Sequence, residues 1–255
     1  MIEIKDYIFS RLKRVDCHFN IAGKDLFDDE KLFYADDSIL FVNNPVEHKT
    51  DSLESYYPLI ENDENRYHIA ANGKDAYEII DVIDKYNCDV IGELNVYKHC
   101  RSNETNEELV HEDRTIIDNQ YIISSGLPCF IHLDLCSRYA EEMLSEILEA
   151  HPERKIVLCH CGINELDDKE AAFERAVKLQ HKYGNLWLEI SYFPVWMWFG
   201  KDHRKISKID TDRLLLGSDF TSYDDIMRWV PVIKNMDYWC KIINIQRNVK
   251  NLLKI

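Results

Sequence analysis

Eight short apolar runs recur along this chain, and they constrain its fold more than any other feature of the sequence. Each has the length of a strand and is rich in Val, Ile, Leu and Phe. They span residues 15–21, 38–43, 66–71, 89–95, 128–133, 155–161, 186–191 and 213–219. Between most of them the apolar residues recur at helical spacing, as in 76–83, 139–147 and 172–177. We expect the last of these helices to stop at Gly184, because helices often end at a residue that tolerates a positive φ.

Strands that alternate with helices pair in parallel, because the crossover helix returns the chain to the same end of the sheet. Eight such units in 255 residues predict an α/β fold, a (β/α)8 TIM-like barrel in a single domain over residues 1–255. The alternative is an open, doubly wound sheet. The chain has no Gly-rich loop after a predicted strand, which argues against a phosphate-binding protein of that kind.

The composition limits the kinds of molecule that we expect this protein to bind. With 46 acidic and 31 basic side chains the formal net charge is −15, so we expect no binding to nucleic acid. No run approaches the roughly 18 apolar residues of a membrane helix, and residues 1–13 carry charges where a signal peptide would be apolar. We therefore expect a cytoplasmic protein with reduced thiols and no membrane partner. A homo-oligomer is compatible with the sequence.

Ionisable side chains recur on one row of five predicted strands. In a barrel, alternate residues of a strand point inward, and we assign six groups to the inward row: Asp16, His18, Glu93, His132, His160 and Asp219. Ile91 shares the row of Glu93 in this assignment. Glu189 has the inward parity of the seventh strand, where it contacts substrate or supports the structure.

Three cysteines flank the histidines of this set. Cys17, Cys159 and Cys161 fall on the opposite row, so we expect them to pack against helices as small hydrophobic groups rather than to bind metal.

The inward groups of such a barrel meet at the carboxyl ends of its strands, where barrels of this type keep their active sites. Imidazoles and carboxylates this close together are costly to bury unless a cation lies among them. A mixture of nitrogen and oxygen donors suits zinc, manganese or iron better than calcium or magnesium. The sequence therefore predicts a divalent metal site, with zinc as the first choice.

Short motifs in a fixed order carry a family resemblance along nearly the whole chain. They are VDCHFN with His18, IGE with Glu93, PCFIH with His132, LCHCG with His160, LLLGSDF with Asp219 and the tail QRNVKNLLKI with Asn248. Together they resemble the metal-dependent amidohydrolase superfamily, especially the branch of amidohydrolase-2 and TatD-like hydrolases.

The resemblance implies an enzyme that hydrolyses a small-molecule substrate with the help of one or two divalent ions. The ions would be held by His18, Glu93, His132, His160 and Asp219. It also implies that Asp219 orients the attacking water, accepts its proton and passes that proton to the leaving group. Relatives cleave amide, ester, lactone or phosphoester bonds, and some decarboxylate.

Asn20 departs from the family pattern, because it stands where the first-strand motif Asp-x-His-x-His has its second histidine. An amide oxygen is a poorer ligand than imidazole for such ions. Three outcomes stay open: one metal held mainly by Glu93, His132 and His160; two metals with an altered inner site; or no catalytic metal, in a degenerate barrel that binds or regulates. Asp16 and Asn20 would then orient neighbouring groups or contact substrate.

Residues 192–199 bring five aromatic side chains onto a predicted loop of the catalytic face. This segment is interpreted as a lid over the pocket, a patch for a partner subunit, or packing over the barrel rim.

Overall fold

The structure is a computed structural model that describes residues 15–21, 37–42, 67–99, 108–110, 113–164, 168–219 and 226–254, with side chains within 17–18, 68–96, 114–164, 168–219 and 231–254. Its elements are, in chain order, β1 (Val15–Ile21), β2 (Asp37–Val42), β3 (Tyr67–Ala71), α3 (Ala76–Tyr86), β4 (Val90–His99), β5 (Glu108–Val110), α4 (Asp113–Ile117), α5 (Gln120–Ser124), β6 (Cys129–Leu133), α6 (Arg138–Ala150), β7 (Ile156–Leu158), η2 (Cys159–Gly162), α7 (Lys169–Lys182), β8 (Leu186–Ile190), α8 (Phe193–Gly200), η3 (His203–Lys208), η4 (Thr211–Arg213), β9 (Leu214–Leu216), α9 (Ile226–Cys240) and α10 (Ile245–Leu253).

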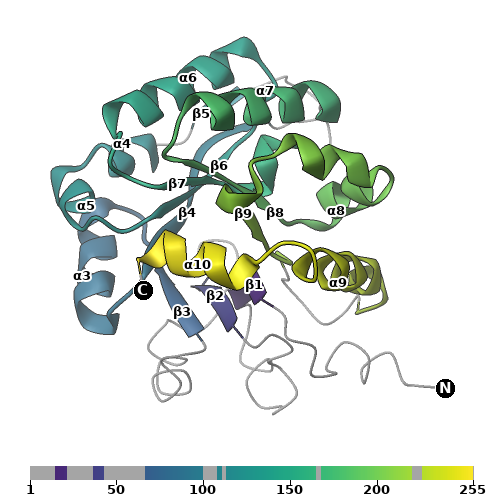
Figure 1. Ribbon diagram of the computed structural model, residues 1–255. Helices are drawn as coiled ribbons and strands as arrows, with labels where there is room; N and C mark the ends of the chain where they lie inside the picture. The colour runs from purple at the N-terminus through teal and green to yellow at the C-terminus, as the bar shows by residue number, and fades with distance from the viewer. Residues whose placement is uncertain are drawn as a thin grey trace.

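Eight parallel strands form the centre of the described molecule, in the order β1-β2-β3-β4-β6-β7-β8-β9 (Figure 1). The sheet curls until β9 contacts β1, where the amide of Asp219 donates a hydrogen bond to the carbonyl of His18 over 2.7 Å. Helices surround the strands, as the alternation of elements requires. The predicted (β/α)8 TIM-like fold is confirmed.

The eight predicted strands match the eight parallel strands closely. The strand predicted over 89–95 continues to His99, the one predicted over 155–161 ends at Leu158, and the one predicted over 213–219 ends at Leu216. β5 was not predicted and pairs antiparallel with the end of β4. Residues 43–66, between β2 and β3, lie outside the described part of the chain.

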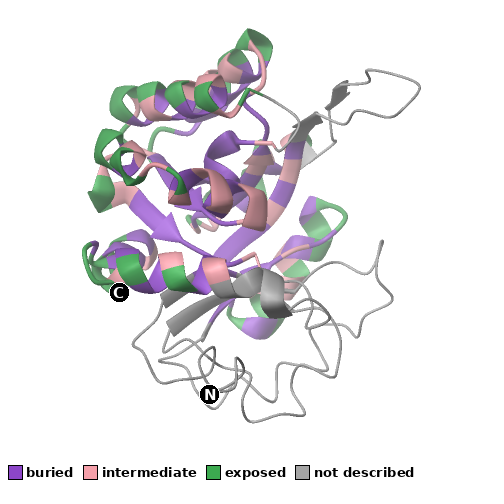
Figure 2. Cartoon of the chain, turned by 90° about the vertical axis from the view of Figure 1, so that its right-hand side faces the viewer, coloured by how far each residue is buried: buried purple, intermediate pink, exposed green. Residues whose placement is uncertain are grey.

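The helices bury one face against the sheet. In α6 the buried residues recur at helical spacing, as Ala140, Met143, Leu144 and Ile147 do, and Ser137 caps the first turn by accepting a hydrogen bond from the amide of Ala140. Figure 2 shows the same division, with buried strands inside and exposed residues on the outer faces of the helices. The strands therefore lie in a buried apolar layer, which fixes the positions of their carboxyl ends.

The end of α7 differs from the expectation. The helix ends at Lys182, and its cap Tyr183 is extended, with φ −114° and ψ 119°. Gly184 thus does not supply a left-handed residue, and the prediction that the helix stops there for that reason is wrong. After the extended cap, residues 184–185 form a turn without a positive φ, and β8 begins at Leu186.

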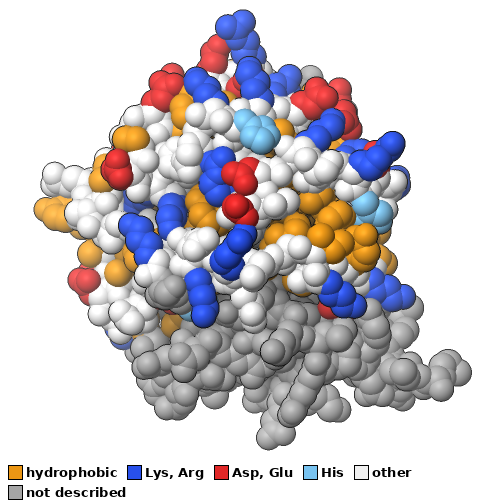
Figure 3. Space-filling model, in the orientation of Figure 1, with side chains coloured by type: hydrophobic (Ala, Val, Ile, Leu, Met, Phe, Trp, Pro, Cys, Tyr) orange, Lys and Arg blue, Asp and Glu red, His pale blue; other side chains and the backbone are white. Residues whose placement is uncertain are grey.

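The aromatic segment after β8 is a helix, α8, rather than a loop. Trp196 is buried and its indole Nε1 donates to the carbonyl of Gly217 over 2.8 Å, and Phe199 is buried as well. On the surface, apolar side chains gather over α8 and α9 (Figure 3). Tyr238 of α9 and Ile242, just after this helix, are exposed. Trp196 and Phe199 therefore pack over the barrel, as the third interpretation of the segment holds.

The closing helix α10 is tied to the last strand. Asn248 is buried, and its side-chain amide donates to the carbonyls of Thr211 and Leu214, each over 2.7 Å. This bond pair joins α10 to the start of β9. None of the helices in the described ranges is long and apolar enough to cross a membrane.

Candidate metal centre

Six ionisable side chains from six strands converge at the carboxyl ends of the barrel strands. They are His18 of β1, Glu93 of β4, His132 of β6, His160 just after β7, Glu189 of β8 and Asp219 just after β9. The five predicted metal ligands thus lie together, and Glu189 joins them. Asp16 and Asn20 belong to β1, but their side chains lie outside the described part of the chain.

Glu93, His132 and His160 form a first group, named here the outer trio. One ligand atom from each lies within 4.8 Å of the others. Glu93 Oε1 is 3.2 Å from His132 Nδ1 and 3.3 Å from His160 Nε2. The side chains of Glu93 and His132 keep 20% and 16% of their surface exposed. The outer trio therefore meets the requirements of a metal site that solvent can reach.

His18, His160 and Glu189 form a second group, named here the inner trio, again with ligand atoms within 4.8 Å of one another. Glu189 Oε2 is 3.5 Å from His18 Nδ1 and accepts the backbone N–H of His160 over 3.1 Å. The side chains of His18 and Glu189 are both 0% exposed. The two trios share His160, and they differ in their access to water.

Asp219 lies beside both trios but belongs to neither. Its Oδ1 is 3.7 Å from His18 Nε2, and its backbone has a positive φ of 56°. Burial raises the pKa of the Asp219 carboxyl above its usual value, although the nearby His18 and His160 oppose the shift. A carboxyl with a raised pKa can hold a proton closer to neutral pH than an ordinary aspartate.

The ionisable groups of the site shift one another's pKa values. Burial disfavours the ionised form of Glu93, but hydrogen bonds from His132 and His160 hold its pKa well below the usual value. Burial likewise lowers the pKa of His132, yet Asp134 and Glu93 raise it to about 10. The pKa of His18 also reaches about 10, because Glu189, Glu93 and Asp219 outweigh its burial. In the metal-free site Glu93 is therefore held as a carboxylate, and His18 and His132 as imidazolium groups, at neutral pH.

Strict alternation along the strands was only partly correct. In β4, Ile91 and Leu94 pair with Cys129 and Ile131 of β6, so β4 carries one residue more than β6 over this stretch. Cys129 and Ile131 share a face, and Ile91 therefore does not share the inward row that we assigned to it. A similar register shift lies between Asp16 and Phe19 in β1.

The row assignment in β7 was wrong. Val157 pairs with Phe130 of β6 and Trp187 of β8, which are on the rows of His132 and Glu189. Cys159 thus continues the inward row, not the outward one.

His160 reaches the site by a turn, because it has φ 57° and Cys161 has φ 54° after the strand has ended. Burial raises the pKa of both the Cys159 and the Cys161 thiol well above the usual value, with further contributions from nearby carboxylates. Both side chains are buried, as we expected, and neither belongs to a trio.

Sequence reasoning missed three polar residues that support the trios. Asp134 Oδ1 is 3.1 Å from His132 Nε2, and Asn164 donates to Asp134 Oδ2 over 2.8 Å. Ser191 Oγ lies 2.7 Å from His160 Nδ1 and 2.7 Å from Glu189 Oε2. Asp134 follows His132 by two residues and Ser191 follows Glu189 by two, so the alternation of each strand, continued past its end, was the signal for both.

The donor set fits a divalent ion. Each trio combines carboxylate oxygen with imidazole nitrogen, the donors that zinc, manganese and iron accept. Glu189 Oε1 is buried and has no hydrogen-bond partner within the described residues, so a cation nearby would relieve it. A Cβ on Gly217 would lie 2.4 Å from His18 Cβ and 2.5 Å from Glu189 Oε1, so the site needs glycine there to close.

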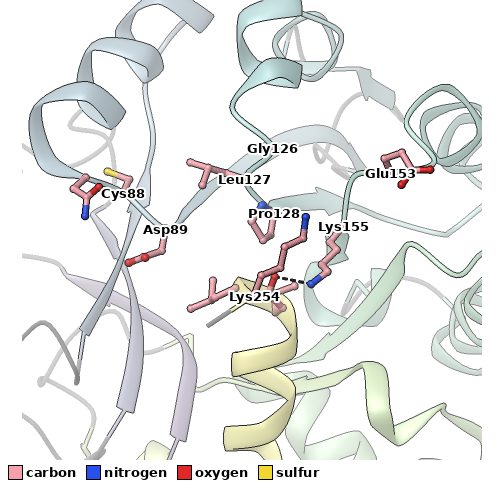
Figure 4. Close-up of a pocket in the computed structure, with 11 residues that line it drawn as sticks. Cys88, Asp89, Gly126, Leu127, Pro128, Glu153, Lys155 and Lys254 are labelled. Atoms are coloured by element: carbon pink, nitrogen blue, oxygen red, sulfur yellow. Dashed lines mark hydrogen bonds between the residues drawn. The ribbon is translucent and has the colours of Figure 1, made fainter.

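A cavity of about 240 Å³ lies at the opposite, amino-terminal end of the strands. It is lined by residues that precede β4, β6 and β7 and by the end of α10, including Cys88, Asp89, Lys155 and Lys254 (Figure 4). Lys155 Nζ donates to the carbonyl of Leu252 over 2.9 Å, so it caps the last turn of α10. This cavity therefore lies beside the capped end of α10, at the opposite end of the strands from the ionisable cluster.

Comparison with known proteins gives a fold and no family name. No family model matches the chain. No curated protein matches it either. Solved structures do match. One from Acinetobacter baumannii, named as a 2-pyrone-4,6-dicarboxylic acid hydrolase with citric acid bound, is 13% identical, covers 96% of this chain and 100% of its own, and has a TM-score of 0.62.

Two further structures extend the comparison. One under the same enzyme name, from Pseudomonas putida, is 10% identical over 96% of this chain and 98% of its own, with a TM-score of 0.64. A 5-carboxyvanillate decarboxylase from Novosphingobium aromaticivorans, complexed with manganese and a nitrobenzoic acid, is 12% identical over 96% and 97%, with a TM-score of 0.53. At these identities the likeness establishes the shared barrel fold.

Proposed function

We propose that this protein is a metal-dependent hydrolase of the amidohydrolase superfamily, acting on a small-molecule substrate. The observation that carries the proposal is the outer trio, in which one carboxylate oxygen lies 3.2 Å and 3.3 Å from two imidazole nitrogens at the carboxyl mouth of the barrel. That mouth is where barrels of this fold carry out chemistry. The names of the solved structures with this fold, hydrolases and decarboxylases, support the class.

In the proposed mechanism Glu93, His132 and His160 hold the ion. A divalent ion supplies Lewis acidity, which acidifies water and polarises a carbonyl or phosphoryl group. Asp219 takes up the proton of the attacking water on its carboxylate and later gives it to the leaving group. Its pKa, raised by burial, suits both steps. His18 stays beside Asp219, with its Nε2 3.7 Å from Oδ1, and stabilises the anionic form.

One ion per chain is the proposed stoichiometry, with zinc or manganese as the metal. Nitrogen and oxygen donors accept either ion, and manganese is present in a decarboxylase of the same fold. The bond that is broken is an amide, ester, lactone or phosphoester bond. The TatD-like part of the sequence resemblance, the single domain and the cytoplasmic location stay predictions.

Metal analysis combined with two variants tests the proposal. Purified protein is expected to contain or take up about one equivalent of zinc or manganese, and His132→Ala is expected to lose it. Asp219→Asn should keep the metal and lose turnover, since it removes the proton acceptor and leaves the outer trio intact. Tyr139→Phe changes an exposed side chain of α6 and serves as the control for both. Protein that stays metal-free in excess metal, or an activity indifferent to chelators, would refute the proposal.

A substrate panel separates the reaction types. Lactones, esters, amides, phosphoesters and hydroxybenzoates are offered to the metal-loaded protein, and release of acid or of carbon dioxide is recorded. Release of carbon dioxide from a hydroxybenzoate would mean that the protein is a decarboxylase and not a hydrolase. Asn20→His tests the degenerate barrel of the sequence analysis, because a gain of both metal and hydrolysis would mean that the natural chain has lost catalysis.

A further inference from the structure

His160 is the one side chain that both trios need, and its ring lies between two fixed partners. Its Nδ1 is 2.7 Å from Ser191 Oγ, and its Nε2 is 3.3 Å from Glu93 Oε1. The ring also stacks on His18, with centroids 5.4 Å apart and planes 24° apart. With the ring held in this way, the position of its hydrogen decides which nitrogen has a lone pair for a metal.

The hydrogen can be assigned by counting donors. Glu189 Oε2 accepts the backbone N–H of His160 over 3.1 Å and faces His18 Nδ1 at 3.5 Å, so it is an acceptor. Ser191 Oγ lies 2.7 Å from that same oxygen. A serine hydroxyl has a single hydrogen. Ser191 therefore donates to Glu189 and has only lone pairs left for His160.

We propose that Ser191, oriented by Glu189, is a positioning residue that keeps the hydrogen of His160 on Nδ1. His160 Nδ1 donates to Ser191 Oγ, and Nε2, which lies 3.3 Å from Glu93 Oε1, is left as the nitrogen that an ion in the outer trio could take. The same hydrogen prevents Nδ1 from binding an ion on the inner side, which assigns His160 to the outer trio alone. This inference rests on the proposed function where it concerns metal, and its hydrogen-bond basis is independent of it.

Burial makes this assignment stable. Ser191 and Glu189 are fully buried and His160 is nearly so, so water does not compete for these bonds. The partner on the far side of a ligating histidine commonly sets its tautomer, and losing that partner weakens metal binding by about 10- to 100-fold. Here the partner is a hydroxyl group, whose direction is set in turn by a buried carboxylate.

The first test reads the tautomer without metal. Protein labelled with ¹⁵N in histidine is metal-stripped, and long-range ¹H–¹⁵N spectra are recorded over a pH series, with the His160 ring assigned by its absence from a His160→Gln sample. Nδ1 is expected to carry a hydrogen at each pH, whether or not Nε2 also carries one. In Ser191→Ala this preference should weaken. A His160 ring without a hydrogen on Nδ1 in the natural protein would overturn the proposal.

The second test measures zinc affinity by competition with a chelator. Ser191→Ala is expected to bind zinc about 10- to 100-fold more weakly, whereas Ser191→Thr, which keeps the hydroxyl, should recover most of the affinity. Ser145→Ala is the control, since it removes another hydroxyl donor, whose acceptor is the backbone carbonyl of Glu141 on the outer helix α6. Unchanged zinc affinity in Ser191→Ala would contradict the inference. Natural protein that binds no zinc would instead refute the proposed function, and the tautomer would still be decided by the first test.

Discussion

The outer and inner trios use the same imidazole and similar donors, yet only one of them is open to solvent. Glu93 and His132 are partly exposed, whereas His18 and Glu189 have no exposed surface. An ion in the outer trio can exchange water for substrate, because part of its coordination sphere faces the mouth of the barrel. The inner trio has no such opening.

This difference in solvent access indicates that the two trios, although similar in their donor atoms, have different roles. In the inner trio the carboxylate of Glu189 already has partners, since Ser191, the backbone of His160 and His18 surround Oε2. A buried hydrogen-bond network of this kind fixes the positions of its side chains and takes no part in the reaction itself. We therefore interpret the inner trio as the support of the outer one. Three measurements test this interpretation.

The largest expected effect is on stability. Glu189→Ala leaves the cationic His18 in a buried site, and loss of one partner of a buried ion pair costs about 3–5 kcal/mol in the free energy of unfolding. Urea unfolding of the metal-stripped protein, followed by tryptophan fluorescence, measures it. Glu149→Ala removes a carboxylate of similar bonding, to Tyr183 and Lys182, from the surface, where a much smaller loss is expected because solvent screens the charges. Equal losses in the two variants would contradict a supporting role for the inner trio.

The second effect is the pH dependence of metal affinity. The pKa of His132 in the metal-free protein is about 10, so an ion must displace its proton, and raising the pH removes that competition. Zinc or manganese affinity should therefore rise about tenfold per pH unit between pH 7 and pH 9, measured by chelator competition in a non-coordinating buffer. Affinity that is flat over this range would exclude His132 as a ligand.

The same titration sharpens the comparison of the trios. His18 also has a pKa of about 10. A rise near a hundredfold per pH unit would mean that His18 loses its proton as well, which brings the inner trio into metal binding. In the metal-free protein both raised values stabilise the fold below about pH 6.5, and this contribution is lost as the pH approaches 10.

The smallest effect concerns the support of the outer trio itself. Asp134→Asn replaces the carboxylate that faces His132 Nε2 at 3.1 Å and should weaken metal binding about tenfold. Asn164→Ala, which removes only the donor to Asp134, should have a smaller effect. A larger loss in Asn164→Ala than in Asp134→Asn would reverse the assumed order of these two groups.

The fold was largely predictable because its signal is local. Each parallel strand is apolar over its own length, and eight such runs admit few closed arrangements. β5 was missed because a three-residue edge strand, Glu108–Val110, has too few residues to show a period. The end of α7 was placed wrongly because Gly184 suggested a left-handed turn that the extended Tyr183 makes unnecessary.

The site was predictable as a set of residues and less so as a geometry. His18, Glu93, His132, His160 and Asp219 do converge, but His160 arrives by a left-handed turn and not by strand alternation. A turn of this kind is set by its surroundings in the folded protein, which a local pattern cannot contain. For the same reason Cys159 was assigned to the wrong row.

The hydrogen bond from Asp219 to His18 has a consequence for the order in which the site is assembled. It joins residues from the two ends of the sheet, and its neighbour Ser218 stands 200 positions after His18 in the chain. Contacts so distant in sequence form late, after the intervening strands have assembled. Glu93, His132 and His160 all precede β9, so a nascent chain that lacks its final strand already carries the outer trio, whereas Asp219 joins His18 only when that strand docks.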